Sequence, residues 1–257
     1  MKVLFIGDVT GQSASEALCS FLPGYKRELG IDKGAVVING ENSADGNGIT
    51  PHSAGLLFKA GADVITTGNH CYKRQVMDDM YRENPFVLRP ANFGSSPPGK
   101  GVCIIDRGSF SIAVINIIGT TFMAPADNPF KCIDEVLKTI QTKNIIVDFH
   151  AEATAEKRAM GLYLAGRVSA VIGTHTHVQT ADEQLIDTTA YITDAGMTGV
   201  QTAVLGINKD VIIERFMDYY PQKHVFASGK HSLNAAVIDI DEKTGKAQDI
   251  KRINIDL

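Results

Sequence analysis

Six short apolar runs, separated by segments of helical periodicity, recur along most of this 257-residue chain. Each run has the length of a β-strand, and helices between strands are the usual connections of a parallel sheet. The pattern therefore predicts an α/β fold in which these strands pair in parallel. The runs cover residues 3–6, 35–38, 63–66, 145–147, 170–172 and 191–193.

Four segments between the runs carry helix signals. Pro23 lies inside the first and predicts an interruption or kink, because proline cannot donate a backbone hydrogen bond. Thr50 before Pro51 is typical of an N-cap, and Asn128 before Pro129 also starts a helix. The expected helices cover residues 13–29, 51–60, a segment that starts at Pro129, and 153–164.

Two pairs of extended segments predict β-hairpins. Residues 102–105 and 110–118 flank one short turn, and residues 234–241 and 248–257 flank another. Antiparallel hairpins beside parallel runs predict a second sheet of mixed strand direction.

Residues 84–101 contain four prolines and predict a long loop. Residues 94–100 in this loop have the spacing of a phosphate-binding P-loop. Gly101, however, stands where that motif needs Ser or Thr, and a strand-like segment follows in place of a helix, so we reject a P-loop.

Composition limits the class of protein. Hydrophobic residues make up 44% and charged residues 21%, as in ordinary globular chains, and we expect one domain over residues 1–257. The net charge of −4 predicts no stable nucleic-acid binding, which needs clustered Lys and Arg. The first apolar run is too short for a signal peptide or a membrane span, and the four cysteines form no CxxC pair. We therefore expect a cytoplasmic protein with reduced thiols and no membrane contact.

Side chains that bind metals follow the apolar runs at their carboxyl ends. In open α/β sheets this edge binds ligands, so we expect these side chains to converge there. Turn formation alone explains why Gly, Asn and Asp follow a strand. It does not explain why four of the seven histidines lie at these strand ends. The candidates are Asp8, Glu41, Asn42, Asn69, His70, His150, His175 and His177.

The donor types in this set indicate a metal site. Oxygen and imidazole donors without a thiolate are typical of Mn, Fe or Zn, and argue against Cu(I) or an iron–sulfur cluster. The donors outnumber those that one tetrahedral ion needs, which favours two ions sharing a carboxylate. Two such ions clamp a phosphoryl group and generate hydroxide near neutral pH, so phosphoester hydrolysis is the reaction that this set serves best.

Five spaced motifs lie in order at the strand ends: Gly7-Asp8, Asn39-Gly40-Glu41-Asn42, Gly68-Asn69-His70, Phe149-His150 and Gly173-Thr174-His175-Thr176-His177. Together they resemble the calcineurin-like metallophosphoesterases, and more closely their YmdB-like bacterial branch. The likeness continues through residues 89–93, 148–154, 178–182 and 193–199, so it covers nearly the whole chain. It implies a four-layer αββα sandwich, with two mixed sheets flanked by helices and a two-metal site at one edge.

The resemblance also implies a role for each candidate. It places Asp8, Asn42 and His177 on one ion, Asn69, His150 and His175 on the other, and Glu41 between them. His70 would donate a proton to the leaving oxygen while a metal-bridging hydroxide attacks phosphorus in line. The implied activity is a phosphodiesterase for small cyclic nucleotides such as 2′,3′-cyclic AMP, and the family's assembly implies a homo-oligomer.

The chain departs from the wider superfamily in ways that bear on the metal. Asp8-Val9-Thr10 replaces the usual Asp-x-His, Glu41 replaces a bridging Asp, and Cys71 replaces an acidic residue. Fewer imidazoles and more oxygen donors favour Fe or Mn and leave Zn and Mg open.

Other assignments stay open on sequence grounds. Arg89 and Asn92 are candidate contacts for the substrate phosphate or base, and Asp194 is a candidate support for a histidine ligand. The same metals would serve a phosphomonoesterase, either a nucleotidase or a phosphoprotein phosphatase. A regulatory protein that keeps its metals but acts through a partner is the third reading.

Overall fold

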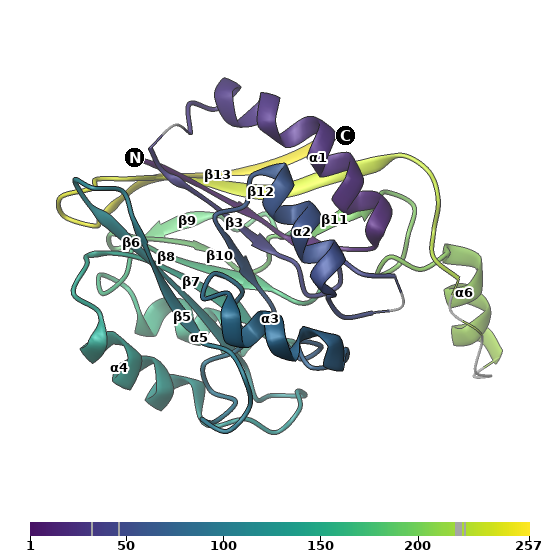
Figure 1. Ribbon diagram of the computed structural model, residues 1–257, viewed down its shortest axis with the longest axis horizontal. Helices are drawn as coiled ribbons and strands as arrows, with labels where there is room; N and C mark the ends of the chain where they lie inside the picture. The colour runs from purple at the N-terminus through teal and green to yellow at the C-terminus, as the bar shows by residue number, and fades with distance from the viewer. Residues whose placement is uncertain (32, 46, 219–222, 224) are drawn as a thin grey trace.

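Two sheets of mixed strand direction lie face to face in the computed structural model, which describes all residues except 32, 46, 219–222 and 224 (Figure 1). The first sheet contains β1 (Lys2–Ile6), β2 (Asp8–Val9), β3 (Ala35–Asn39), β4 (Val64–Thr66), β11 (Met197–Val200), β12 (His231–Ile240) and β13 (Ala247–Asp256). The second contains β5 (Val102–Asp106), β6 (Ser111–Ile118), β7 (Asn144–His150), β8 (Ala170–Thr174), β9 (Gln184–Ile186) and β10 (Thr189–Ile192).

Each apolar run of the sequence lies within or overlaps a strand, and these strands pair in parallel as predicted. In the first sheet β1 pairs with β3 and β3 with β4, and in the second β6, β7, β8 and β10 follow one another. Both predicted hairpins, β5–β6 and β12–β13, are present and antiparallel. The predicted α/β fold with two mixed sheets is therefore confirmed.

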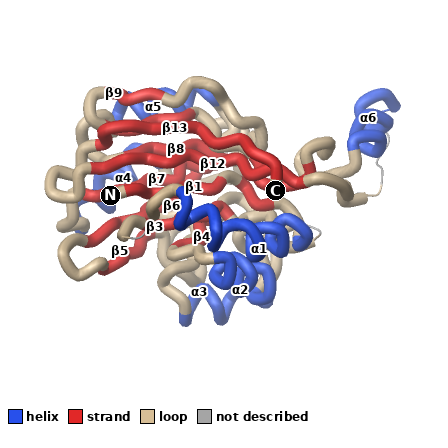
Figure 2. The backbone as a smooth tube through the Cα atoms, turned by 90° about the horizontal axis from the view of Figure 1, so that it is seen from above, coloured by secondary structure: helices blue, strands red, loops and turns tan. Residues whose placement is uncertain are grey.

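Helices cover the outer faces of both sheets (Figures 1 and 2). Buried residues of α1 and α2 pack on β1 and β3, and buried residues of α4 and α5 pack on β6 and β7. In Figure 2, α6 projects from the body at the end of a long segment. The helices are α1 (Gln12–Glu28), α2 (Pro51–Ala60), the short 3-10 turn η1 (Gln75–Met77), α3 (Asp78–Glu83), α4 (Pro129–Thr139), α5 (Thr154–Tyr163) and α6 (Lys209–Asp218).

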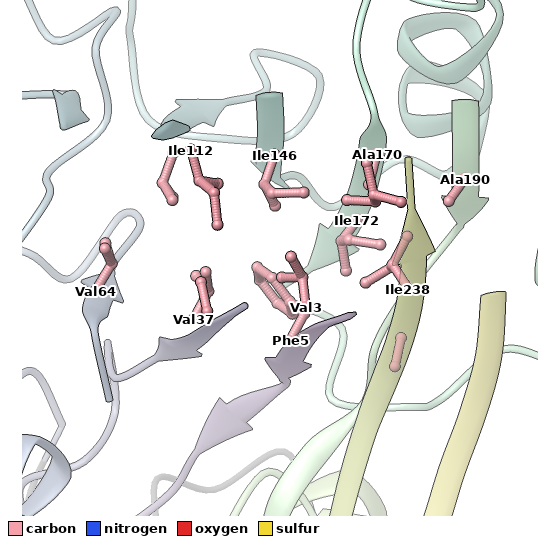
Figure 3. Packing of buried hydrophobic residues seen from close by; sticks show 14 of the residues in the cluster. Val3, Phe5, Val37, Val64, Ile112, Ile146, Ala170, Ile172, Ala190 and Ile238 are labelled. Atoms are coloured by element: carbon pink, nitrogen blue, oxygen red, sulfur yellow. The ribbon is translucent and has the colours of Figure 1, made fainter. Parts of the chain in front are cut away.

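The core between the sheets is built from small and branched apolar side chains. Val3 and Phe5 of β1 face Ile146 and Ile172 of the second sheet (Figure 3). Alternate residues of β1, such as Leu4, belong instead to the cluster beneath the helices. Because strand side chains alternate between faces, a strand that is apolar on both faces fits the middle of a layered fold.

The predicted interruption at Pro23 is wrong, because α1 runs from Gln12 to Glu28 with Pro23 inside it. A proline inside a helix costs about 3 kcal/mol. Leu18 and Leu22 are fully buried, and burying two leucines is worth roughly 3–6 kcal/mol. The packing of one helix face thus outweighs the local signal, and Pro23 lies on the exposed side.

No helix among the described residues is long and apolar enough to cross a membrane. Cys19, Cys71, Cys103 and Cys132 are all free thiols, as the sequence predicts.

A buried ion pair joins α5 to the segment that follows β10. Lys157 Nζ donates to Asp194 Oδ2 at 2.6 Å, and each side chain is only 1% exposed. The same carboxylate accepts hydrogen bonds from the backbone N–H and the hydroxyl of Thr176 at 3.0 and 2.7 Å. The pair therefore anchors the loop after β8.

We expect Lys157→Met to lower the free energy of unfolding by about 3–5 kcal/mol, because it leaves a buried carboxylate without its cation. Lys138→Met is the matched control, since Lys138 pairs with Glu135 on an exposed helix surface and its loss should change little. Urea unfolding of both variants measures the difference. Equal losses would contradict the anchoring role of the pair.

Candidate active site

All eight strand-end candidates meet at one edge of the two sheets. Glu41 and Asn42 follow β3, Asn69 and His70 follow β4, and Asp8 begins β2. The remaining three come from the second sheet, where His150 ends β7 and His175 and His177 follow β8. An unbroken chain of contacts of 3.5 Å or less connects all eight residues.

The first group of donors surrounds the ring of His150. Its Nε2 lies 2.9 Å from Glu41 Oε2, 3.0 Å from Asn69 Oδ1 and 3.1 Å from His175 Nδ1. One ring nitrogen carries at most one hydrogen, so it cannot satisfy three acceptors at once. Such an excess of lone pairs in a buried space fits a bound cation.

The second group lies around His177. Its Nε2 is 3.5 Å from Asp8 Oδ1 and 3.4 Å from Asn42 Nδ2. The Asn42 amide directs Oδ1 to His70 Nδ1 at 3.0 Å, and a half-turn of the amide would exchange its oxygen and nitrogen in the same volume. Asp8 Oδ1 and Glu41 Oε2 are buried oxygens toward which no N–H or O–H group of the described residues is well aligned. Both oxygens are therefore candidate metal ligands.

The electrostatics keep both carboxylates ionised. Burial raises the pKa of Glu41, but contacts with His150 and His70 outweigh it and hold this pKa well below the usual range. Burial likewise raises the pKa of Asp8, but His177 and His150 together outweigh it, so this pKa is lowered. Burial and the neighbouring His150 lower the pKa of His175, which favours its neutral form. Despite burial, the two carboxylates in turn raise the pKa of His150 to about 9 and also raise that of His177, so a cation that binds here has to displace protons from these two rings.

The loop after β8 directs its two imidazoles to different groups. His175 and His177 have φ values of 100° and 63°, in the left-handed region that costs non-glycine residues about 1–2 kcal/mol each. Thr176 between them is held by Asp194. As a result, His175 Nδ1 faces His150 while His177 Nε2 faces Asp8. Asp194, the candidate support for a histidine ligand, accepts its hydrogen bonds on this loop from Thr176, so it supports His175 and His177 through the loop.

Several supporting residues lie in the segments that carry the family resemblance, but the sequence assigned them no role. His150 Nδ1 lies 2.9 Å from Thr174 Oγ1, which donates to Asp148 Oδ1 at 2.7 Å. Asn39 Nδ2 donates to the other Asp148 oxygen at 3.1 Å. Glu152 Oε2 lies 2.9 Å from His175 Nε2, on the far side of the ring from His150. Second partners of this kind fix the orientation of ligating imidazoles.

A cavity of about 540 Å³ opens on these groups. His70, His175 and His177 form part of its lining, together with Glu152. Its volume lies within the range of about 300–1,000 Å³ that small-molecule sites occupy. Four other lining residues come from segments without any strand-end motif, which is why sequence reasoning missed them: Asn47, Leu205, Ile207 and Phe226.

Arg89, Asn92 and Cys71 are buried beside this edge. Arg89 donates to the carbonyls of Pro90 and Gly94 at 2.7 and 2.8 Å, and Asn92 exchanges hydrogen bonds with the backbone of Ile118. Both side chains therefore brace loops, and a contact with substrate stays a prediction. Burial raises the pKa of the Cys71 thiol, so this cysteine is no thiolate nucleophile.

Comparisons with known proteins match the whole chain. The model of the family described as YmdB-like protein matches residues 4–253. A 2′,3′-cyclic-nucleotide 2′-phosphodiesterase from Bacillus subtilis (strain 168) is 44% identical over 99% of this chain and 97% of its own length.

Two crystal structures share the fold closely. One, of a protein from Thermus thermophilus, superimposes with a TM-score of 0.93 at 36% identity and covers 100% of this chain and 99% of its own. The other, of a Mycoplasma pneumoniae phosphatase, has a TM-score of 0.93 at 30% identity, with 100% and 93% covered.

Gly68 leaves no room for a side chain, because a Cβ there would overlap Glu41 Oε2 and the His150 ring. We expect Gly68→Ala to reduce turnover by roughly 100-fold, since a misplacement of about 1 Å in an active site has that effect. Gly55→Ala is the matched control, because a Cβ at Gly55 meets nothing within 4 Å. Turnover near the wild-type level in Gly68→Ala would show that Glu41 and His150 need not lie this close.

Proposed function

This chain belongs to the YmdB-like protein family, and from this premise we propose that it is a metal-dependent phosphodiesterase that hydrolyses 2′,3′-cyclic nucleotides. The observation that carries the proposal is the pair of donor groups on either side of Glu41. The substrate class is that of the Bacillus subtilis relative, a 2′,3′-cyclic-nucleotide 2′-phosphodiesterase.

We assign one metal ion to each donor group. Asp8, Asn42 and His177 would hold one, and Asn69, His150 and His175 the other, with Glu41 shared between them. Asp8 Oδ1 and Glu41 Oε2 support this assignment, because both oxygens are buried and lack a hydrogen-bond donor among the described residues. When bound, two ions supply Lewis acidity toward the phosphoryl oxygens and toward a water molecule. The oxygen-rich donor set favours Fe or Mn and leaves Zn and Mg open.

We propose His70 as the group that donates a proton to the leaving oxygen. Its Nδ1 lies 2.9 Å from Glu41 Oε1, so Glu41 fixes the orientation of the ring. Its Nε2 lies 3.4 Å from Asn47 Nδ2, and both residues line the cavity. In this arrangement Nε2 of the protonated ring donates to the leaving 2′-oxygen as the ring of the cyclic phosphate opens.

The charge of the cavity favours a diester over a monoester. No Lys or Arg lines it within the described part of the chain, and Glu152 adds a carboxylate. A phosphodiester carries one negative charge, whereas a phosphomonoester carries nearly two at neutral pH. A phosphomonoesterase is the second candidate, because the Mycoplasma pneumoniae relative is described as a phosphatase.

The proposal includes the domain organisation, location and assembly of the protein. We expect one domain over residues 1–257 in the cytoplasm, where the four free thiols stay reduced. We also expect a homo-oligomer without stable nucleic-acid or membrane contacts.

We expect the purified protein to contain about two transition-metal ions per chain by elemental analysis. In a panel of 2′,3′-cyclic, 3′,5′-cyclic and monoester nucleotides, assayed with Mn, Fe and Zn, the 2′,3′-cyclic compounds should be hydrolysed fastest. Metal content well below one ion per chain after anaerobic preparation would refute the metal assignment. Faster hydrolysis of the monoesters would favour the phosphomonoesterase.

Substitution of histidines separates metal binding from proton transfer. We expect His70→Ala to keep its metal and lose about 10²–10⁴-fold in turnover, the usual contribution of a general acid. His150→Ala should lose metal as well as turnover. His52→Ala is the control, since His52 is an exposed residue of α2. Equal metal loss in the His70 and His150 variants would make His70 a ligand and remove it as the acid.

A further inference from the structure

A tight turn of unusual composition lies at the edge of the catalytic cavity. Val204 and Ile207 exchange backbone hydrogen bonds of 2.9 Å in both directions, which leaves Leu205 and Gly206 as the two residues of the turn. Their φ values are 53° and 82°, so both are left-handed. Turns of this form normally carry Asn or Asp before Gly, because a branched apolar residue is strained there by about 1–2 kcal/mol.

The turn is fixed in place by its neighbours. A Cβ at Gly206 would overlap Thr10 Cγ2, so the turn lies against the segment that begins with the proposed metal ligand Asp8. On its other side, Ala227 N–H donates to Gly206 O at 3.0 Å and Asn208 N–H donates to Val225 O at 2.8 Å. The strained conformation of Leu205 is therefore held by packing.

Folding gives no reason for a leucine at this position. Its side chain is 53% exposed, so it contributes little burial to offset the strain. It does line the catalytic cavity, together with Ile207 and Phe226, and every other described lining residue is polar. The cavity thus has a polar part beside the metal donors and an apolar part formed by these three residues.

We propose that Leu205, Ile207 and Phe226 form an apolar subsite that receives the nucleobase of the cyclic nucleotide. This inference rests on the proposed function. The polar part of the cavity holds the phosphate and ribose, while the flat face of the base covers the three apolar side chains. Because apolar contact scales with area and these side chains offer no hydrogen bonds, the subsite favours purines over pyrimidines without reading base edges.

The experiment compares Leu205→Asn with Leu205→Met. Asn adopts the left-handed conformation readily, so the turn should fold at least as well while the apolar surface is lost. Met keeps an apolar side chain of similar volume. Leu185→Asn is the control for an exposed leucine elsewhere, because Leu185 lies in β9 and does not line the cavity.

The first readout is binding to the metal-containing protein, which needs no turnover. Calorimetry gives Kd for adenosine 3′-monophosphate and for inorganic phosphate. Leu205→Asn should raise the Kd of adenosine 3′-monophosphate by about tenfold, which is the effect of losing one leucine contact. The Kd of inorganic phosphate should not change. Leu185→Asn should match the wild type, and Leu205→Met should lose less affinity than Leu205→Asn because it keeps an apolar side chain. Equal Kd values for the two ligands in the wild type, or an equal loss for both in Leu205→Asn, would overturn the subsite.

The second readout is kcat/KM for 2′,3′-cyclic AMP and for the base-free diester glycerol 1,2-cyclic phosphate. Leu205→Asn should lose about tenfold on the nucleotide alone, mainly through KM. Wild-type protein that binds adenosine 3′-monophosphate through Leu205 but hydrolyses neither diester would refute the proposed function and retain the subsite. Unchanged kinetics in Leu205→Asn, with an active wild type, would refute the subsite and retain the function.

Discussion

The buried carboxylate of Glu41 is the contact on which the site depends. Its Oε1 lies 2.9 Å from His70, which follows β4 of the first sheet, and its Oε2 lies 2.9 Å from His150, which ends β7 of the second. One side chain therefore joins the edges of both sheets. Gly68 leaves the space for this approach, since any side chain there would occupy it. The position of the candidate metal donors follows from how the two sheets pack.

That packing also stabilises the strained loop that carries His175 and His177. Their left-handed backbones are unfavourable locally, and the loop is held by Asp194, whose charge is balanced by the buried Lys157. The imidazoles are thus oriented before any ligand binds. A preorganised site of this kind stabilises a transition state better than one that must rearrange.

Sequence reasoning recovered the layered fold because most of its strands carry their own signal, although β2, β9 and β11 were not predicted. An apolar run of strand length followed by Gly, Asn, Asp or His marks a buried strand and the edge at which it ends. The eight candidate ligands were found for the same reason, and they do lie together. The signal failed where tertiary packing outweighs local preference: Pro23 stays inside a continuous helix because Leu18 and Leu22 are buried beneath it.

The sequence by itself determined most of the strands and the identity of the candidate metal donors, since these depend on residues close together in the chain. The helical segments between strands also predicted their parallel pairing. Only the tertiary structure decided which donors share a group, that Asp194 holds Thr176, and that Leu205 lines the cavity. Those facts depend on distances between residues far apart in sequence. Strand packing sets these distances, and no local pattern encodes them.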